Sequence, residues 1–292
     1  MKPLLFNLDS DISLANALKD KLGADAGELD TRYFPDGESY LRVLSECNNR
    51  SVIIFCNLHQ PNNKTLNLLF LASTVKALGA KRIGLATPYL PYMRQDKQFK
   101  PGECVSSRPF AKLLSSHFDW LVTLDPHLHR YHSLSEIYSL DSTVVHAAPM
   151  IAEWIKKHVK RPLLIGPDSE SEQWVSDVAA RANAPFQVLT KVRKGDYHVE
   201  VSLPQVEQWH QHTPVLVDDI ISSGKTMLNT VQHLAAAKLA TPVCIGVHGL
   251  FSNEAYDELA RNATVVTCNC IPHASNKIDI SEALADAIHA QL

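Results

Sequence analysis

Short apolar runs alternate with amphipathic segments along the whole chain. Runs of this length that end in polar or turn-forming residues are typical of buried strands, and the segments between them show helical periodicity. The predicted strands are Leu4–Asn7, Ser51–Cys56, Arg82–Ala86, Trp120–Leu124, Leu163–Pro167, Pro185–Thr190, Pro214–Val217, Val243–Gly249 and Thr264–Cys268. The predicted helices are Ser10–Lys21, Lys64–Leu78, Ser106–Ser116, Ala147–Val159, Ser169–Ala182, Met227–Ala237 and Ala255–Arg261. This alternation indicates an α/β fold with mostly parallel sheets flanked by helices.

A length of 292 residues suits two domains of about 140 residues each. We expect an N-terminal domain over residues 1–145 and a C-terminal domain over residues 146–280, with the junction near residues 143–148. Residues 281–292 are predicted to form a terminal helix that could pack back on the first domain.

Composition narrows the classes of protein. A net charge of −3 argues against a general nucleic-acid or membrane-surface binder. The six cysteines show no paired C-x-x-C spacing, which fits a reducing compartment, and Cys56 and Cys244 lie in apolar runs typical of core residues. No apolar run approaches the length of a membrane span. The apolar run at the N-terminus is too short for a secretory signal. We therefore expect a cytoplasmic protein without nucleic-acid or membrane partners.

The segment from Val215 to Met227 carries the strongest chemical signal. An apolar strand runs into Asp218 and Asp219, a small-residue turn follows, and a helical pattern begins. Such a turn presents unpaired backbone N–H groups to an anion, and the carboxylates can bind ribose hydroxyls or a metal ion. A P-loop would need glycine where Asp219 stands, so that reading fails. The alternatives are a site for a phosphorylated sugar and an ordinary strand–turn–helix with a solvated acidic pair.

Polar residues also follow predicted strands in the N-terminal half. The loop after Arg82–Ala86 is stiffened by prolines and tyrosines and then presents Arg94, Gln95 and Asp96 in succession. A guanidinium fork suits phosphate, whereas the alternative is a polar surface loop. Asp125, His127 and His129 follow the next strand and could bind a divalent ion or form a surface cluster.

Three further segments are weaker when taken alone. The Pro-Asp-Gly sequence between Phe34 and Glu38 predicts a hairpin turn. Asp168 follows the predicted strand Leu163–Pro167, and Ser169 with Glu172 fits a helix capping box. Residues 190–197, with three basic residues among positions 191–194, predict a mobile cationic loop or a solvated face.

Taken in order, these segments resemble the ribose-phosphate pyrophosphokinase family, which makes phosphoribosyl diphosphate (PRPP). The Asp-Asp loop alone also resembles type I phosphoribosyltransferases. Those enzymes lack the Phe-x-Asp-Gly-Glu segment at 34–38 and the Tyr-x-Arg-Gln-Asp segment at 92–96. The resemblance implies two phosphoribosyltransferase-like domains and transfer of the β,γ-diphosphate of ATP to the C1 hydroxyl of ribose 5-phosphate.

The resemblance also implies roles for individual residues. By this resemblance, Lys191 and Arg193 are the catalytic residues that stabilise the negative charge on the transferring diphosphate. ATP binding falls to Phe34, Asp36, Gly37, Glu38, Arg94, Gln95, Asp96 and His127. Binding of ribose 5-phosphate falls to Asp168, Arg193, Asp218, Asp219, Ser222, Ser223, Gly224, Lys225 and Thr226. Mg²⁺ is the implied cofactor, with Asp125, His127 and Asp168 as its candidate ligands, and a homo-oligomer is implied in which a neighbouring subunit completes the ATP site.

The sequence departs from the family pattern at two of these positions and carries one extra histidine near a third. Ser222 stands where the family commonly has an acid, Lys225 stands where it has glycine, and His129 has no inherited role. A diphosphokinase for another sugar phosphate, a non-catalytic regulatory homologue and a phosphoribosyltransferase are therefore the alternatives, separated by whether AMP forms and with which acceptor.

Overall fold

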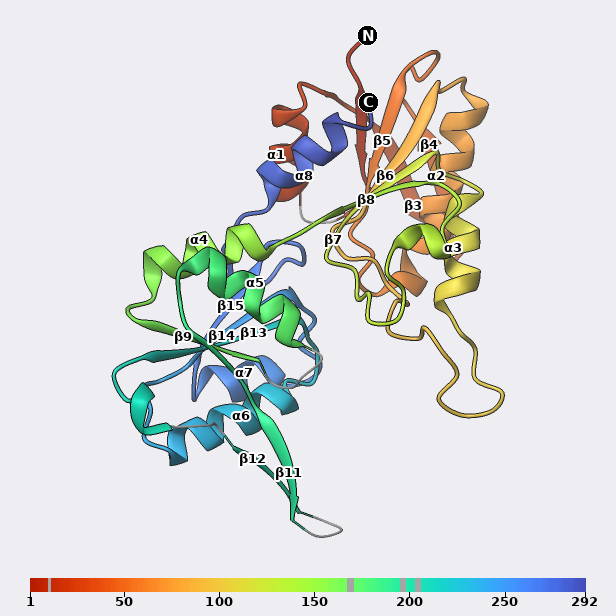
Figure 1. Ribbon diagram of the computed structural model, residues 1–292. Helices are drawn as coiled ribbons and strands as arrows, with labels where there is room; N and C mark the ends of the chain where they lie inside the picture. Colours follow the sequence, from red (N-terminus) through yellow and green to blue (C-terminus); the bar gives the residue numbers. More distant parts are fainter. Residues whose placement is uncertain (10–11, 167–170, 195–197, 203–205) are drawn as a thin grey trace. The chain divides into compact units, whose positions relative to one another are not determined.

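The computed structural model describes the chain apart from residues 10–11, 167–170, 195–197 and 203–205 (Figure 1). The chain divides into two compact units. The first comprises residues 1–145 and 280–292, and the second comprises residues 146–279. Each unit is an α/β structure around its own parallel sheet.

The first unit contains a six-stranded sheet in the order β2-β1-β5-β6-β7-β8, and all its strand pairs are parallel. Its strands are β1 (Leu4–Asn7), β2 (Asp25–Ala26), β5 (Ser51–Phe55), β6 (Arg82–Ala86), β7 (Trp120–Leu124) and β8 (Asp141–Val145). The helices are α1 (Ser13–Lys21), η1 (Pro61–Asn63), α2 (Thr65–Ala77), α3 (Ser107–Ser115), η2 (Leu134–Glu136) and α8 (Ser281–His289). Figure 1 shows α1 and α8 on one face of this sheet and α2 and α3 on the other. Because the strands are parallel, their carboxyl ends share one edge of the sheet.

Close packing fixes the centre of this sheet. A Cβ atom on Gly84 of β6 would lie 1.8 Å from the ring of Trp120 on β7, so only glycine fits beside that side chain. Trp120 is fully buried. The C-terminal helix α8 joins the same unit, where Glu282 pairs with Lys21 of α1 and the carbonyl of Gln291 accepts from Arg82.

A separate hairpin extends from the first unit. Strands β3 (Leu29–Tyr33) and β4 (Ser39–Val43) pair antiparallel, and β4 packs on α2. The predicted hairpin turn is confirmed, since the N–H of Phe34 donates to the carbonyl of Glu38 at 2.8 Å.

The second unit contains a six-stranded sheet in the order β10-β9-β13-β14-β15-β16, again with all pairs parallel. Its strands are β9 (Pro162–Gly166), β10 (Phe186–Val188), β13 (Thr213–Ile221), β14 (Val243–Gly249), β15 (Thr264–Cys268) and β16 (Asn276–Ile278). The helices are α4 (Ala148–His158), α5 (Glu172–Ala182), η4 (Val206–Trp209), α6 (Lys225–Ala236) and α7 (Ala255–Ala260). Helices α4 and α5 pack together, while α6 and α7 lie on the other face of the sheet (Figure 1).

The predicted α/β fold class is confirmed in both units. Several details differ from the predictions. The short edge strands β2, β8 and β16 were not predicted, and β13 continues to Ile221 rather than ending at Val217. The backbone of β11 (Thr190–Lys194) pairs antiparallel with β12 (His198–Ser202), so residues 190–194 form a strand and the prediction of a loop there was wrong. Helix α5 begins at Glu172, while Ser169 of the predicted capping box lies outside the described residues.

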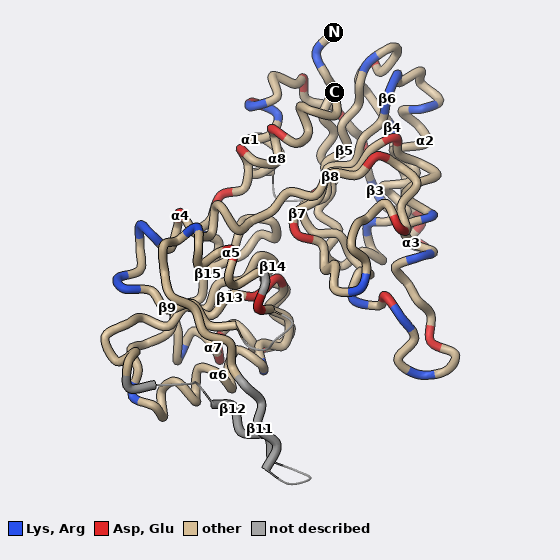
Figure 2. Tube along the Cα trace, viewed as in Figure 1, with Lys and Arg blue, Asp and Glu red and all other residues tan. Residues whose placement is uncertain are grey.

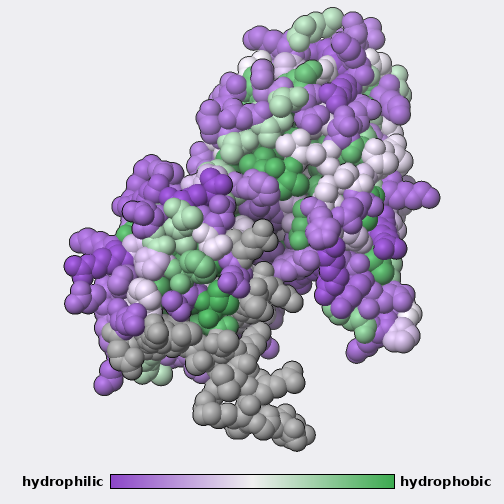
Figure 3. Space-filling model, viewed as in Figure 1, coloured by the Kyte–Doolittle hydropathy of each residue, from purple (hydrophilic) through white to green (hydrophobic). Residues whose placement is uncertain are grey.

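Burial agrees with the apolar pattern. Cys56 and Cys244 are core residues as predicted, and burial raises the pKa of the Cys244 thiol to about 12. The surface in Figure 3 is mostly hydrophilic, with small hydrophobic areas on each unit. Among the helices that the structure describes, none has both the length and the apolar character needed to cross a membrane.

Candidate functional site

The loop after β6 places two of the predicted ATP-binding side chains at the surface. Tyr92 has a left-handed backbone with φ of 62°, and Met93 is buried in the core of the first unit. This anchoring leaves Arg94 and Gln95 exposed directly after the buried side chain. The hydroxyl of Ser106 donates to Oε1 of Gln95 at 2.6 Å, which holds the amide of Gln95 in one orientation.

Asp96 lies differently from its two predecessors. Its side chain is 1% exposed, and Nη1 of Arg130 donates to its two carboxylate oxygens at 2.8 and 3.0 Å. Arg130 belongs to the loop after β7. Sequence reasoning did not single out Arg130, and the only local signal would have been a basic residue directly after His129.

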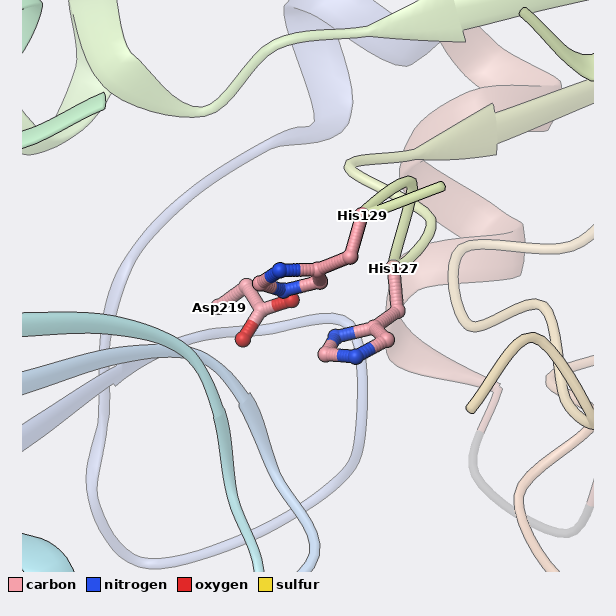
Figure 4. A group of neighbouring side chains, drawn as sticks. All are labelled: His127, His129 and Asp219. Carbon is pink, nitrogen blue, oxygen red and sulfur yellow. The ribbon is translucent and has the colours of Figure 1, made fainter. Parts of the chain in front are cut away.

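The loop after β7 carries the predicted metal and ATP ligands of the first unit. Asp125 has φ of 31°, its backbone N–H donates to the carbonyl of Val145 at 2.9 Å, and its side chain is nearly buried. The imidazole rings of His127 and His129 lie together, with centroids 3.9 Å apart (Figure 4).

Asp125 and His127 could supply only a small part of the ligand shell of Mg²⁺. Mg²⁺ prefers oxygen ligands and usually keeps several waters or substrate phosphates, with one or two carboxylates from the protein. Asp125 can supply such a carboxylate. The nitrogens of His127 suit a phosphate oxygen or a water ligand of the ion better than the ion itself.

The hairpin presents its predicted adenine-contacting residues outward. Phe34 is 42% exposed, and its ring meets that of Tyr40 edge-on at 6.3 Å. The guanidinium of Arg32 lies 4.5 Å from the Tyr40 ring centroid and 5.5 Å from that of Phe34. Asp36 accepts from the N–H of Glu38 at 3.2 Å, and Gly37 supplies the positive φ of 91° in the turn. An aromatic ring and two carboxyl groups are thus available at the tip of the hairpin.

A cavity of about 570 Å³ lies beside the hairpin in the first unit. Asp9, Lys19, Arg32 and Lys64 are among its lining residues, with apolar side chains from β1, α1 and β3. None of the predicted ATP-binding residues that the structure describes lines this cavity.

In the second unit, the acidic pair lies near the carboxyl end of β13. Asp218 and Asp219 are half-buried, and Oδ1 of Asp218 accepts from the N–H of Asp219 at 3.0 Å. They lie past the last residue of β13 that pairs with β9, which is Leu216. Figure 2 shows acidic residues gathered at this end of β13, and Asp219 is one of the side chains drawn in Figure 4.

The turn after β13 has the geometry of an anion-binding site. Gly224 has φ of 66° and directly precedes α6, and a Cβ atom there would lie 3.1 Å from Leu259. The N–H of Ser252 donates to the carbonyl of Ser222 at 3.0 Å, which ties the turn to the segment after β14. Ser223, Lys225 and Thr226 are exposed. The first N–H groups of α6 have no partner within the helix and carry the positive end of its dipole.

Three predicted site residues remain, namely Lys191, Arg193 and Asp168. Lys191 and Arg193 lie on β11, where their backbones pair with Val201 and Val199 of β12. Asp168 lies outside the described residues.

Comparison with known proteins gives the chain a family. Residues 3–117 match the N-terminal domain of ribose phosphate pyrophosphokinase, and residues 133–286 match the phosphoribosyl transferase domain. A ribose-phosphate pyrophosphokinase of Sulfolobus acidocaldarius is 30% identical over 89% of this chain and 91% of its own length. One from Methanobrevibacter smithii is 29% identical over 94% of this chain and 96% of its own. The chain belongs to the ribose-phosphate pyrophosphokinase family.

The predicted family is therefore confirmed. A solved phosphoribosylpyrophosphate synthetase from Mycobacterium smegmatis shares the fold of this pyrophosphokinase family member, with a TM-score of 0.86, 24% identity and 99% of both chains covered. The prediction of two phosphoribosyltransferase-like domains is confirmed by the two matches together with this fold. The roles of individual residues in this pyrophosphokinase family member stay predictions.

Proposed function

We propose that this protein transfers the β,γ-diphosphate of ATP to the C1 hydroxyl of ribose 5-phosphate, giving PRPP and AMP. The main support is the similarity to pyrophosphokinases over both domains and nearly the full length of each chain. Three of the motifs that suggested this activity also lie at or just after the carboxyl ends of the parallel strands β6, β7 and β13, where α/β proteins bind ligands.

The step needs little covalent chemistry from the protein. The C1 hydroxyl oxygen forms a bond to the β-phosphorus, and the bond from that phosphorus to the oxygen bridging the α- and β-phosphates breaks. AMP leaves with the bonding electrons, and the hydroxyl loses its proton. Positioning and neutralisation of charge therefore dominate the catalysis.

The first unit would bind ATP. The exposed guanidinium of Arg94 suits the phosphates, and Gln95, held by Ser106, suits a phosphate or the base. His127 would donate to phosphate oxygens. Mg²⁺ bound with ATP would supply further neutralisation of the phosphates, and Asp125 is its candidate ligand in the described part of this unit.

The second unit would bind ribose 5-phosphate. Asp218 and Asp219 would accept hydrogen bonds from the ribose hydroxyls. The N–H groups at the start of α6 and the hydroxyls of Ser222, Ser223 and Thr226 would hold the 5-phosphate. Lys191 and Arg193 would stabilise the charge on the transferring diphosphate, and Asp168 would contribute near the metal and ribose.

A homo-oligomer would complete the ATP site. The hairpin tip carries Tyr33 and Phe34, 65% and 42% exposed, with Asp36 and Glu38 beside them. In the pyrophosphokinase family this segment reaches the adenine of a neighbouring subunit, and the exposed aromatic rings are consistent with that use. Sedimentation should therefore show a dimer or larger particle, and Phe34→Ala should raise the KM for ATP more than the KM for ribose 5-phosphate.

The deciding assay measures AMP release from Mg²⁺-ATP with and without ribose 5-phosphate. We expect AMP and PRPP to form in equal amounts and only with the sugar phosphate. Lys191→Ala should lower kcat by roughly 10²-fold, as expected for a main stabiliser of transition-state charge. Lys157→Ala on the exposed surface of α4 is the control and should leave kcat unchanged.

Each negative result has a separate meaning. AMP that forms with another sugar phosphate but not with ribose 5-phosphate would identify a diphosphokinase of different acceptor. ATP binding without AMP release for any acceptor would indicate a regulatory homologue and would overturn the proposal.

A further inference from the structure

An ion pair ties the two loops that carry the predicted ATP ligands of the first unit. One nitrogen of Arg130, in the loop after β7, donates to both carboxylate oxygens of Asp96, in the loop after β6, at 2.8 and 3.0 Å. The Asp96 side chain is 1% exposed, whereas that of Arg130 is 44% exposed. Charge-assisted hydrogen bonds to a buried carboxylate are stronger than neutral ones, so this pair restrains one loop against the other.

Buried hydroxyl groups extend the connection. The Tyr131 hydroxyl donates to the backbone carbonyl of Asp96 at 3.3 Å, and its oxygen lies 3.3 Å from the hydroxyl oxygen of Ser107. Ser107 also donates to the backbone carbonyl of Gln95 at 3.1 Å. Both Tyr131 and Ser107 are buried. The backbone of Gln95 and Asp96 is therefore held at two successive carbonyls, in addition to the ion pair.

Arg130 makes a second contact with the same loop. Its guanidinium lies 5.6 Å from the ring centroid of Phe99, and Nζ of Lys97 lies 5.2 Å from that centroid. The loop from β6 to α3 projects from the first unit and carries charges of both signs (Figures 1 and 2). Arg130 therefore contacts this loop at both Asp96 and Phe99.

We infer that Arg130 is a positioning residue for ATP, acting through Asp96. Arg94 and Gln95 directly precede Asp96, and His127 lies three residues before Arg130, so the ion pair sets the spacing between these two groups of ligands. Asp96 serves ATP through the ion pair rather than by touching the nucleotide, because its carboxylate is buried and both oxygens accept from Arg130. This inference rests on the proposed function.

The effect should be specific to one substrate. A displacement of about 1 Å in a reacting assembly can lower the rate by roughly 10²-fold. We therefore expect Arg130→Met to lower kcat/KM for ATP between about 10-fold and 100-fold. The KM for ribose 5-phosphate, measured at saturating ATP, should stay within about twofold of the wild type, since uniform binding of that substrate is not altered.

A double-mutant cycle separates positioning from loss of a charge. Asp96→Asn alone should resemble Arg130→Met, and the double variant should be no worse than the more damaging single variant, because both remove one interaction. Arg130→Lys should recover part of the kcat/KM for ATP. The double variant also removes the unpaired buried carboxylate that Arg130→Met leaves, so it tests the inference even where the single variant folds poorly.

Arg50→Met is the matched control. Arg50 pairs with Asp25 at 2.5 Å in the same unit, at the amino ends of the strands and thus at the opposite edge of the sheet. Arg50→Met should lower the melting temperature and leave the KM values for ATP and for ribose 5-phosphate unchanged. An Arg130→Met protein that shows the same pattern, with a changed melting temperature and unchanged kcat/KM for ATP, would overturn the inference.

A second measurement stays informative even where the wild type releases no AMP. Hydrogen exchange of the amides in residues 94–98 and calorimetric binding of a non-hydrolysable ATP analogue should both be measured on wild type and Arg130→Met. Faster exchange with at least tenfold weaker binding of the analogue would support the positioning role independently of the reaction. Unchanged exchange and unchanged binding would refute it.

Discussion

Lys64 and Asp9 form an ion pair of 2.6 Å between the residue before α2 and the segment after β1. The ammonium also donates to the carbonyl of Asn57 at 2.5 Å, and the second carboxylate oxygen accepts from the N–H of Asn57 at 2.5 Å. The Asp9 side chain is only 8% exposed. These contacts join the carboxyl ends of β1 and β5 to the start of α2.

Lys64→Met should therefore be strongly destabilising. It leaves a buried carboxylate without its cation, which typically costs about 3–5 kcal/mol. The double variant Asp9→Asn/Lys64→Met should recover part of this loss because no buried charge remains. Urea unfolding measures the free energy of unfolding of both variants. Lys76→Met, on the exposed side of α2, is the control. A loss for Lys64→Met no greater than that of the control would show that the pair contributes little.

His59 should make the stability of the first unit dependent on pH. Burial, with a further contribution from Lys64, lowers the pKa of His59 below its ordinary value of 6.5. The unfolded chain then binds a proton that the folded chain does not, so stability is lost as the pH falls from about 7 through the ordinary pKa towards the lowered one. Melting temperatures from pH 8 to pH 5 should fall less for His59→Gln than for wild type. His132→Gln, at an exposed position in the same unit, should follow the wild type, and parallel curves for all three proteins would contradict the assignment.

Central strands could be read from the sequence, whereas the edge strands β2, β8 and β16 could not; β10, at the remaining sheet edge, was predicted as Pro185–Thr190. Strands β1, β6, β7, β14 and β15 begin and end at the predicted residues because strands buried on both faces form uninterrupted apolar runs. In contrast, β8 is the edge strand Asp141–Val145, whose polar first residues hide it. Strand β11 reads as a loop because its pattern is basic, and only its pairing with β12 makes it a strand.

The candidate site shows the same division. The polar residues at the ends of β6, β7 and β13 were predictable because parallel strands place their carboxyl ends at one edge. The ion pair of Asp96 with Arg130 was not predictable, since its partners are separated by 34 positions and meet only after the sheet has formed. Burial of Asp96 also could not be inferred from its place between exposed Gln95 and Lys97.

Gly224→Ala should impair binding of ribose 5-phosphate. The left-handed φ of 66° is unfavourable for alanine, and its Cβ would lie 3.1 Å from Leu259, so the turn before α6 must shift. We expect the KM for ribose 5-phosphate to rise at least about tenfold, since small displacements of binding groups have large effects. Gly23→Ala is the matched control, because Gly23 has φ of 58° with no atom within 4 Å of the added Cβ. It should share the backbone strain and leave the KM unchanged. If the two variants had equal KM values for ribose 5-phosphate, the turn before α6 would not belong to the binding site.

Lys225→Gln should have opposite effects on stability and on binding. Lys225 is the exposed first residue of α6, where a cation is unfavourable beside the positive end of the helix dipole. Removing the charge should leave the melting temperature unchanged or slightly higher. A lysine at this place is useful only with a bound anion, so the same variant should raise the KM for ribose 5-phosphate by roughly tenfold, the size expected for one charge-assisted hydrogen bond. The difference from wild type should shrink at high salt because exposed charges are screened. A lower melting temperature with an unchanged KM would instead mean that Lys225 supports the fold and does not contact the sugar phosphate.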